Sequence, residues 1–291
     1  MKKLTLLFLI SIVLFENIKA QQVNSNGFDP LPVSTPDVPK TYSLFGEKMP
    51  LDNFDVRERF DKELLMNTFM QGSTSLIIKF MGRYMPMIEK KLKENGVPDD
   101  FKYLCIAESA LRNQTSKAGA VGFWQFMKGT APSFGLYIDG EVDERYDPIK
   151  STDAACTYLK QAYNKFGNWT AAAASYNCGM GGLNGAASRE GTNDFYKLFL
   201  PDETMAYIYR IAALKYILDN HQAFGFKLKE DDIYKPLRTK SMVVNYGLGD
   251  LYAFAKSKGT DYKTIRVLNP WLRSSTFSNS KGRTYTILLP E

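Results

Sequence analysis

The sequence is poor in the residues on which several common active sites depend. Its 291 residues include one histidine, His221, and three cysteines, Cys105, Cys156 and Cys178. No Cys-x-x-Cys pair occurs. These absences argue against a zinc site, a Ser-His triad and a Cys-His dyad, since each needs histidine or clustered cysteine. We therefore expect no metal and no cofactor, and we interpret Cys105 and Cys156 as small buried hydrophobes on helical faces.

The sequence also lacks a hydrophobic run long enough to cross a bilayer. The apolar stretch Leu4–Phe15 follows Lys2 and Lys3 and is too short for a comfortable span. Together with a small-residue site before Gln21, it predicts a cleaved export signal over residues 1–20. No cysteine lies near this site, so a lipid anchor is not predicted. We expect an exported protein in the periplasm or associated with the cell envelope, without a transmembrane segment.

A strong charge of one sign is absent as well. The chain has 37 Lys and Arg against 31 Asp and Glu, a formal charge of +6, and removal of residues 1–20 leaves about +4. This mild excess favours contact with an anionic polymer but does not require it. The one basic run, Lys90–Lys93, is interpreted as a solvated helix face. We expect no nucleic-acid partner.

The proline distribution and hydrophobic periodicity divide the chain into segments. Residues 21–51 contain five prolines and are predicted to be an extended leader or linker. Helical periodicity then continues over residues 52–226, which predicts a compact, mainly α domain. The clearest helix is predicted over residues 151–166, with Ser151 as a plausible N-cap. The pattern over residues 241–291 predicts a strand, two helices and a second strand, in that order, and therefore a small α+β module.

One carboxylate lies on an apolar helix face. Phe101, Leu104 and Cys105 share that face, and Glu108 returns to nearly the same side. An ionised glutamate is costly to bury, so burial would raise its pKa and keep a proton on it near neutral pH. A general acid needs this property. The alternative is a glutamate at the frayed edge of an ordinary helix.

Four motifs follow one another in a characteristic order: Glu108-Ser109, Gly119 to Met127 (GAVGFWQFM), Asp143-Glu144-Arg145, and Ala174 to Gly179 (ASYNCG). Over residues 80–220 they resemble the lysozyme-like domain of lytic transglycosylases, a fold shared with goose-type lysozyme. The similarity is greatest to the membrane-bound lytic transglycosylase D type. The resemblance implies a mainly α, lysozyme-like domain that binds peptidoglycan glycan strands.

The resemblance also implies a reaction and a set of site residues. Glu108 would act alone as general acid and then base, cleaving the bond between N-acetylmuramic acid and N-acetylglucosamine and forming 1,6-anhydromuramoyl ends during murein turnover. Seven residues match substrate-binding positions of the family, and several have a structural alternative such as a helix cap or a turn. They are Ser109, Gln125, Met127, Tyr176, Asn177, Glu203 and Tyr207. Trp124 is either core or a sugar platform, and Asp143-Glu144-Arg145 is interpreted as a structural ion-pair loop.

The C-terminal residues 241–291 resemble a LysM module, which grips N-acetylglucosamine chains. Asn269-Pro270 and the closing Ile287 to Pro290 match well, whereas Gly249-Asp250 fits only loosely. The resemblance leaves open whether the module binds sugar or only packs on the catalytic domain.

Two other functions remain open at this point. A hydrolytic lysozyme on the same fold would need a second carboxylate to hold water, for which Asp143, Glu144, Asp147 and Glu203 are candidates. A non-catalytic wall-binding protein would rely on the C-terminal module. The combination of Glu108, Gln125, Tyr176 and Asn177 argues against the second alternative. The sequence predicts no oligomeric state.

Overall fold

The computed structural model describes residues 35–291. The predicted export signal and the first part of the predicted leader lie outside the described residues. Within residues 35–291, no helix combines the length and the apolar character needed to cross a membrane.

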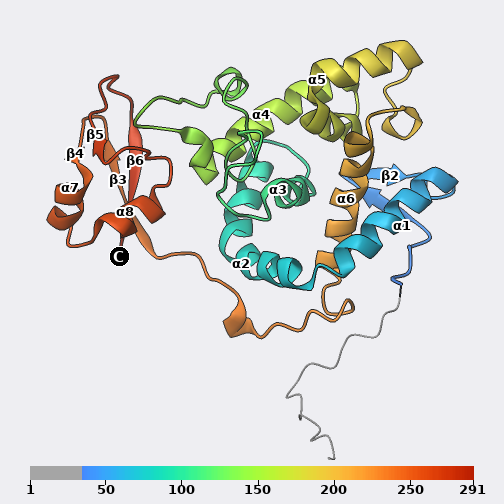
Figure 1. Cartoon of the computed structure of the whole chain (residues 1–291), viewed down its shortest axis with the longest axis horizontal. Helices are drawn as coiled ribbons and strands as arrows, with labels where there is room; N and C mark the ends of the chain where they lie inside the picture. Colours follow the sequence, from blue (N-terminus) through green and yellow to red (C-terminus); the bar gives the residue numbers. More distant parts are fainter. Residues whose placement is uncertain (1–34) are drawn as a thin grey trace, which may run out of the picture. The chain divides into compact units, whose positions relative to one another are not determined.

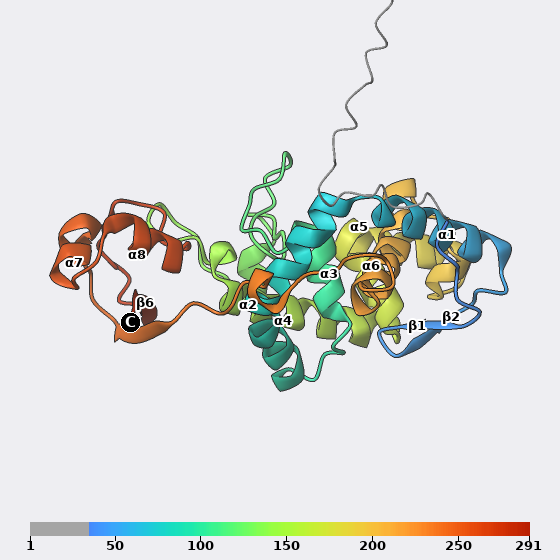
Figure 2. The same ribbon diagram turned by 90° about the horizontal axis from the view of Figure 1, so that it is seen from below.

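The expected mainly helical domain is confirmed (Figures 1 and 2). The short helix α3 packs against α2 and α6, and α6 packs in turn against α1 and α5. The elements of this part are β1 (Tyr42–Leu44), β2 (Glu47–Met49), α1 (Phe54–Thr68), α2 (Gln71–Glu94), α3 (Phe101–Ser109), α4 (Pro148–Phe166), α5 (Trp169–Glu190) and α6 (Asp202–Asp219).

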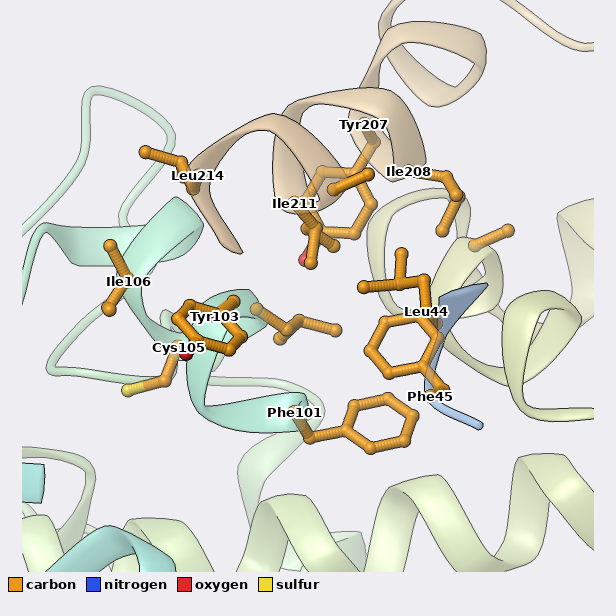
Figure 3. Close-up of a cluster of buried hydrophobic side chains, with 14 of the residues drawn as sticks. Leu44, Phe45, Phe101, Tyr103, Cys105, Ile106, Tyr207, Ile208, Ile211 and Leu214 are labelled. Atoms are coloured by element: carbon orange, nitrogen blue, oxygen red, sulfur yellow. The ribbon is translucent and has the colours of Figure 1, made fainter. Parts of the chain in front are cut away.

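Helix α3 is held by aromatic and aliphatic packing along its apolar face. Phe101 is fully buried, stacks on Phe45 at 4.2 Å between ring centroids and meets Trp169 edge-on at 5.5 Å. Figure 3 shows Phe45 and Phe101 together with Ile208 and Ile211 of α6. The predicted apolar face of α3 is confirmed, and Cys105 and Cys156 are buried free thiols as expected.

The leader differs from the prediction at its C-terminal end. Residues 42–49 form an antiparallel hairpin in which Leu44 and Met49 are fully buried. Strands of three residues are too short to show the alternation of apolar and polar residues that is typical of a strand. The prediction of an extended leader therefore rested on the nearby prolines. The hairpin is anchored by Glu47, whose carboxylate accepts N–H bonds from Trp169 and Thr170 at the start of α5.

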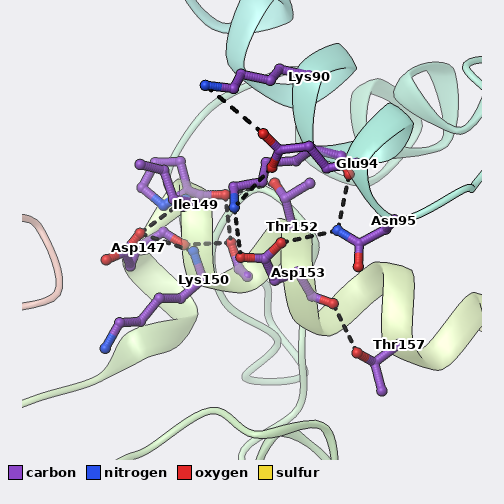
Figure 4. A network of polar contacts seen from close by, with 12 residues as sticks. Lys90, Glu94, Asn95, Asp147, Ile149, Lys150, Thr152, Asp153 and Thr157 are labelled. Carbon is purple, nitrogen blue, oxygen red and sulfur yellow. Dashed lines mark hydrogen bonds and ion pairs between the residues drawn. The ribbon is translucent and has the colours of Figure 1, made fainter.

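The N-termini of α3 and α4 are held in different ways. Asp100 precedes α3, but its carboxylate accepts bonds from Phe45 N and Lys215 Nζ, both at 2.7 Å, and makes no cap bond. Helix α4 begins earlier than expected and is capped by Asp147 instead of Ser151. Figure 4 shows Asp147 beside Ile149, whose backbone N–H it binds at 2.9 Å.

Helix α5 is interrupted at Gly179, where φ is 77° and ψ is 149°. Beyond this point the helix resumes and runs to Glu190. The conformation at Gly179 lies outside the range that L-residues readily adopt. Tyr176 and Asn177 therefore end the first half of a kinked helix.

The C-terminal strand–helix–helix–strand order is confirmed. β3 (Thr239–Val244) pairs antiparallel with β6 (Tyr285–Pro290), and α7 (Leu251–Ser257) and α8 (Tyr262–Leu268) lie between them in sequence. A second short pair, β4 (Gly249–Asp250) with β5 (Thr276–Phe277), was not expected. The core of the module includes Leu251, Ile265, Leu272 and Ile287 and also Val142, from far earlier in the chain.

Candidate active site

Glu108 occupies the last turn of α3, where the helix ends abruptly. Ala110 and Leu111 follow with φ of 52° and 57°. Two consecutive non-glycine residues in the left-handed region cost roughly 1 kcal/mol or more each, and they persist only where surrounding contacts enforce them. Bonds from Ala110 N to Ile106 O at 2.7 Å and from Arg112 N to Ser109 O at 3.0 Å fix the turn.

The environment of Glu108 favours its protonated form. Burial raises the pKa of this carboxyl from 4.5 to about 7, although a hydrogen bond from Tyr207 and the positive charge of Arg210 oppose the shift. The negative charge of Glu203 adds to it. A carboxyl group with a pKa near 7 gives and recovers protons at neutral pH, as acid–base catalysis requires.

Tyr207 contacts Glu108 directly from α6. Its hydroxyl donates a hydrogen bond to Glu108 Oε1, and its ring is almost completely buried. Burial raises the pKa of Tyr207 well above its usual value, and the charge of Glu108 raises it further. The hydroxyl therefore remains a donor over the physiological pH range, and this contact fixes the orientation of the carboxyl group.

An ion-pair network beside this contact was missed by sequence reasoning. Arg210, three residues after Tyr207 on α6, places Nη1 3.2 Å from Glu203 Oε1 and Nε 3.5 Å from Glu63 Oε2. Glu63 comes from α1 and is buried. The helical spacing of Glu203, Tyr207 and Arg210 puts them on one face, and this was the only signal available in the sequence.

The Gly119–Met127 motif forms a tight turn around Trp124 and Gln125. Trp124 is fully buried and its indole N–H donates to Thr152 Oγ1 at 2.8 Å, so it belongs to the core and is not an exposed sugar platform. Gln125 has a left-handed φ of 49° and donates from Nε2 to Gly122 O at 2.6 Å. Tyr176 donates to Trp124 O at 2.8 Å and so links α5 to this turn.

The Asp143–Arg145 ion pair holds this turn from the other side, and its predicted structural role is confirmed. Arg145 Nε and Nη2 lie 2.9 and 2.7 Å from the two carboxylate oxygens of Asp143. Arg145 Nη1 donates to Phe126 O at 3.1 Å. The backbone of Arg145 passes so close to Gly122 that an added Cβ would lie 2.0 Å from the Arg145 carbonyl oxygen.

The remaining predicted site residues differ in exposure and in partners. Met127 is 43 % exposed after the Gln125 turn. Asn177 is exposed and its Oδ1 accepts a bond from Thr204 Oγ1 at 2.9 Å. Ser109 is buried and donates to Cys105 O at 3.2 Å, a bond within its own helix. Direct contact with Glu108 is made by Tyr207.

The four alternative carboxylates have other partners. Asp143 pairs with Arg145, and Asp147 accepts the Ile149 and Lys150 N–H groups at the start of α4. Glu144 is buried, accepts the Tyr137 N–H and pairs with Lys150. Glu203 is exposed and pairs with Arg210. Over residues 35–291, no group of three or more His, Cys, Asp or Glu side chains is arranged to hold a metal ion.

A cavity of about 510 Å³ lies elsewhere in the described chain, lined by residues such as Tyr84, Ile149, Leu237 and Tyr285. Neither Glu108 nor any of the seven predicted substrate-binding residues lines it, whereas Phe123 and Asp147 do.

Comparison with known proteins identifies two regions of the chain. Residues 85–199 match the family model described as "Transglycosylase SLT domain". Residues 240–291 match the model described as "Soluble lytic transglycosylase C-terminal LysM-like domain". The first match contains Glu108, the Gln125 turn and Tyr176, whereas Glu203 and Tyr207 lie just beyond it.

Curated relatives agree with these two matches. The chain is 28 % identical over 251 residues to "Membrane-bound lytic murein transglycosylase D" of Escherichia coli (strain K12), which covers 82 % of this chain and 53 % of the relative. It is 35 % identical over 104 residues to "Peptidoglycan transglycosylase gp16" of Escherichia phage T7, which covers 34 % of this chain and 8 % of that protein. The chain thus spans about half the length of the first relative.

Proposed function

Because the chain carries a transglycosylase SLT domain and a C-terminal LysM-like domain, we propose that it is a lytic transglycosylase that cleaves the glycan strands of peptidoglycan. The bond cleaved joins N-acetylmuramic acid to N-acetylglucosamine. Glu108 is the single general acid and base, and the product carries a 1,6-anhydromuramoyl end.

The reaction uses one proton on one carboxyl group. Protonated Glu108 donates to the glycosidic oxygen as the bond from C1 to that oxygen breaks, and the muramoyl N-acetyl group stabilises the cation. The resulting Glu108 carboxylate then removes the proton of the muramoyl 6-hydroxyl, whose oxygen closes on C1. The proton returns to Glu108 and no water is consumed. Because the attacking hydroxyl is tethered to the same sugar, proximity supplies much of the rate.

The observation that carries this proposal is the environment of Glu108. Burial raises the pKa of this carboxyl to about 7, and the Tyr207 hydroxyl orients it. The partners of the other carboxylates favour the transglycosylase over the hydrolase. A hydrolytic lysozyme needs a second carboxylate to activate water, but Asp143, Glu144 and Asp147 are held by structural partners and Glu203 pairs with Arg210.

The roles of the other predicted residues are part of the same proposal. Tyr207 holds the Glu108 carboxyl group, and Tyr176 supports the turn that carries Gln125. The further substrate contacts are assigned from the family resemblance and the exposure of the side chains. They are Gln125, Met127, Asn177 and Glu203 toward the glycan, with Ser109 toward the N-acetyl oxygen after its bond to Cys105 opens.

The domain boundaries and the location follow from the same interpretation. Residues 52–226 form the lysozyme-like domain, whose core also includes the hairpin at residues 42–49, and residues 241–291 form the LysM-like module. The enzyme is exported and acts at the cell envelope. N-terminal sequencing of the exported protein should give Gln21 as the first residue, whereas an intact Met1 would contradict the export signal.

Product analysis tests the proposed reaction. Sacculi are digested with the wild-type chain, with Glu108→Gln and with the control Glu58→Gln, which changes an exposed glutamate of α1. Mass spectrometry should find anhydromuramoyl ends with the wild type and control and no products with Glu108→Gln. Reducing ends from the wild type would assign a hydrolytic lysozyme. Binding to sacculi without any cleavage would assign a wall-binding protein.

A further inference from the structure

Residues Tyr137–Asp147 lie between the Gln125 turn and α4 in sequence, yet they enter the core of the C-terminal module. Val142 is 2 % exposed and packs in the same cluster as Leu272. The two residues form an antiparallel β-bridge. On either side of it, Asp143 N donates to Trp271 O at 2.9 Å and Arg273 N donates to Glu141 O at 2.7 Å. Backbone pairing and a buried side chain thus join the segment to the module.

Charged and aromatic side chains reinforce this attachment. The Glu141 carboxylate accepts bonds from the Ser278 backbone N–H at 3.0 Å and from its hydroxyl at 2.9 Å. The Arg273 guanidinium lies 4.0 Å from the centroid of the Tyr146 ring, and the Arg283 guanidinium lies 4.3 Å from that of Tyr137. Cation–π contacts of this kind contribute roughly as much as a good surface hydrogen bond.

The same segment reaches the Gln125 turn at its other end. Asp143, whose N–H binds the module, uses its carboxylate to hold Arg145 in a two-point ion pair that is almost completely buried. Arg145 Nη1 then donates to the carbonyl oxygens of Phe126 at 3.1 Å and Gly119 at 3.3 Å. A continuous set of bonds therefore runs from Trp271 through Asp143 and Arg145 to the turn.

Arg145 also limits the turn sterically. Its carbonyl oxygen lies 2.0 Å from the position that a Cβ on Gly122 would take, so the Arg145 backbone packs directly against the turn between Gly122 and Phe126. This turn supplies Trp124 O, the acceptor of the Tyr176 hydroxyl. If the turn forms part of an active site, a displacement of about 1 Å lowers the catalytic rate by up to about two orders of magnitude.

We propose that the C-terminal module positions one wall of the active site, with Arg145 as the positioning residue and Glu141 and Val142 as the attachment to the module. The module is thus part of the catalytic scaffold in addition to any sugar it binds. The structural part stands without the proposed function, whereas the effect on turnover rests on it.

Hydrogen exchange on the full chain tests the structural part. The variant Glu141→Gln/Val142→Ala weakens the attachment, and Glu58→Gln on α1 is the matched control. Amides of residues 137–147 and of 119–126 should both exchange at least about ten-fold faster in the double variant, while those of α6 stay unchanged. If the double variant fails to fold, Ser278→Ala is used in its place. This variant removes the hydroxyl that donates to the Glu141 carboxylate.

Turnover on a short soluble glycan supplies the second readout. In the double variant kcat should fall about ten-fold or more, because the turn that carries Gln125 is displaced. Unchanged exchange over 119–126 would overturn the proposal, whether or not residues 137–147 exchange faster. If the wild type shows no turnover, the proposed function fails and the exchange data still decide the positioning role.

Discussion

Tyr207 donates its hydroxyl hydrogen to Glu108 Oε1, joining two residues 99 positions apart in sequence. The bond favours the ionised carboxylate, whereas burial of the same carboxyl group favours the neutral acid. Burial is the larger effect, so the pKa of Glu108 is raised to about 7. The two opposing effects keep this proton exchangeable near neutral pH, and the sign of each can be tested separately.

The first prediction concerns the pH dependence of activity. Glu108 must carry a proton to act as acid, so kcat/KM on a soluble glycan should fall as pH rises through about 7. The measurement is the rate between about pH 5 and pH 9. The control is thermal unfolding at each pH, which separates titration of Glu108 from loss of structure. A rate that keeps increasing into alkaline pH, with the protein intact, would contradict a protonated Glu108.

The second prediction concerns stability. Because the folded pKa of Glu108 is above its ordinary value of 4.5, the folded chain binds this proton more tightly than the unfolded chain does. The resulting stabilisation is complete below pH 4.5 and is lost as pH rises through about 7. Its upper limit is about 3 kcal/mol, since one pKa unit corresponds to about 1.4 kcal/mol.

Glu108→Gln removes this titration and so provides the measurement. Urea unfolding of both proteins should show the variant gaining stability relative to the wild type as pH is raised from about 5 to about 8. A difference between the two proteins that does not change with pH would count against the raised pKa. The same variant should lose wall cleavage while remaining folded.

The third prediction separates the hydrogen bond from the burial. Tyr207→Phe removes the donor that favours ionised Glu108, so the activity midpoint should move to higher pH. The rate should fall about ten-fold at the optimum because the carboxyl group loses its fixed orientation. Tyr209→Phe on the same helix, a buried tyrosine that packs on Phe195, is the control and should leave the midpoint in place. A midpoint that moves down in Tyr207→Phe would reverse the assigned sign.

The place of Glu108 on an apolar helix face was predictable because its signal is local. The interval from Phe101 to Glu108 is about two helical turns, so the apolar face and the carboxylate follow from spacing alone. The partners of Arg210 were not predictable in the same way. Glu63 lies on a different helix far earlier in the chain, and nothing in the residues near it indicates that it is buried. Such pairs depend on packing between helices, which periodicity does not specify.

In the C-terminal module, too, the local elements could be predicted from the sequence and a long-range contact could not. Its strands and helices follow from alternation and helical spacing, and all four major elements were expected. Its contact with Val142 was not expected, because Val142 is a single apolar residue in a polar loop. The sequence pattern there predicts an ion-pair loop, which is present. A single β-bridge to Leu272 produces no periodic pattern of apolar residues in the sequence. Such contacts are set by tertiary structure alone.

The last prediction concerns the hairpin that the sequence pattern concealed. The Glu47 carboxylate accepts the N–H groups of Trp169 at 2.6 Å and Thr170 at 2.9 Å, and the Thr170 hydroxyl at 2.6 Å. It therefore satisfies donors at the first turn of α5, the helix that carries Tyr176, and its charge suits the positive end of the helix dipole.

Glu47→Ala should leave these donors unpaired and lower the free energy of unfolding by roughly 2 kcal/mol. Glu58→Ala on α1 is the control, because Glu58 is exposed, and it should change stability by less than about 0.5 kcal/mol. The measurement is the midpoint of urea unfolding, compared at equal slope so that the change reflects stability. If Glu47→Ala unfolds at the wild-type midpoint, the hairpin does not hold the start of α5 and is only an attached strand pair.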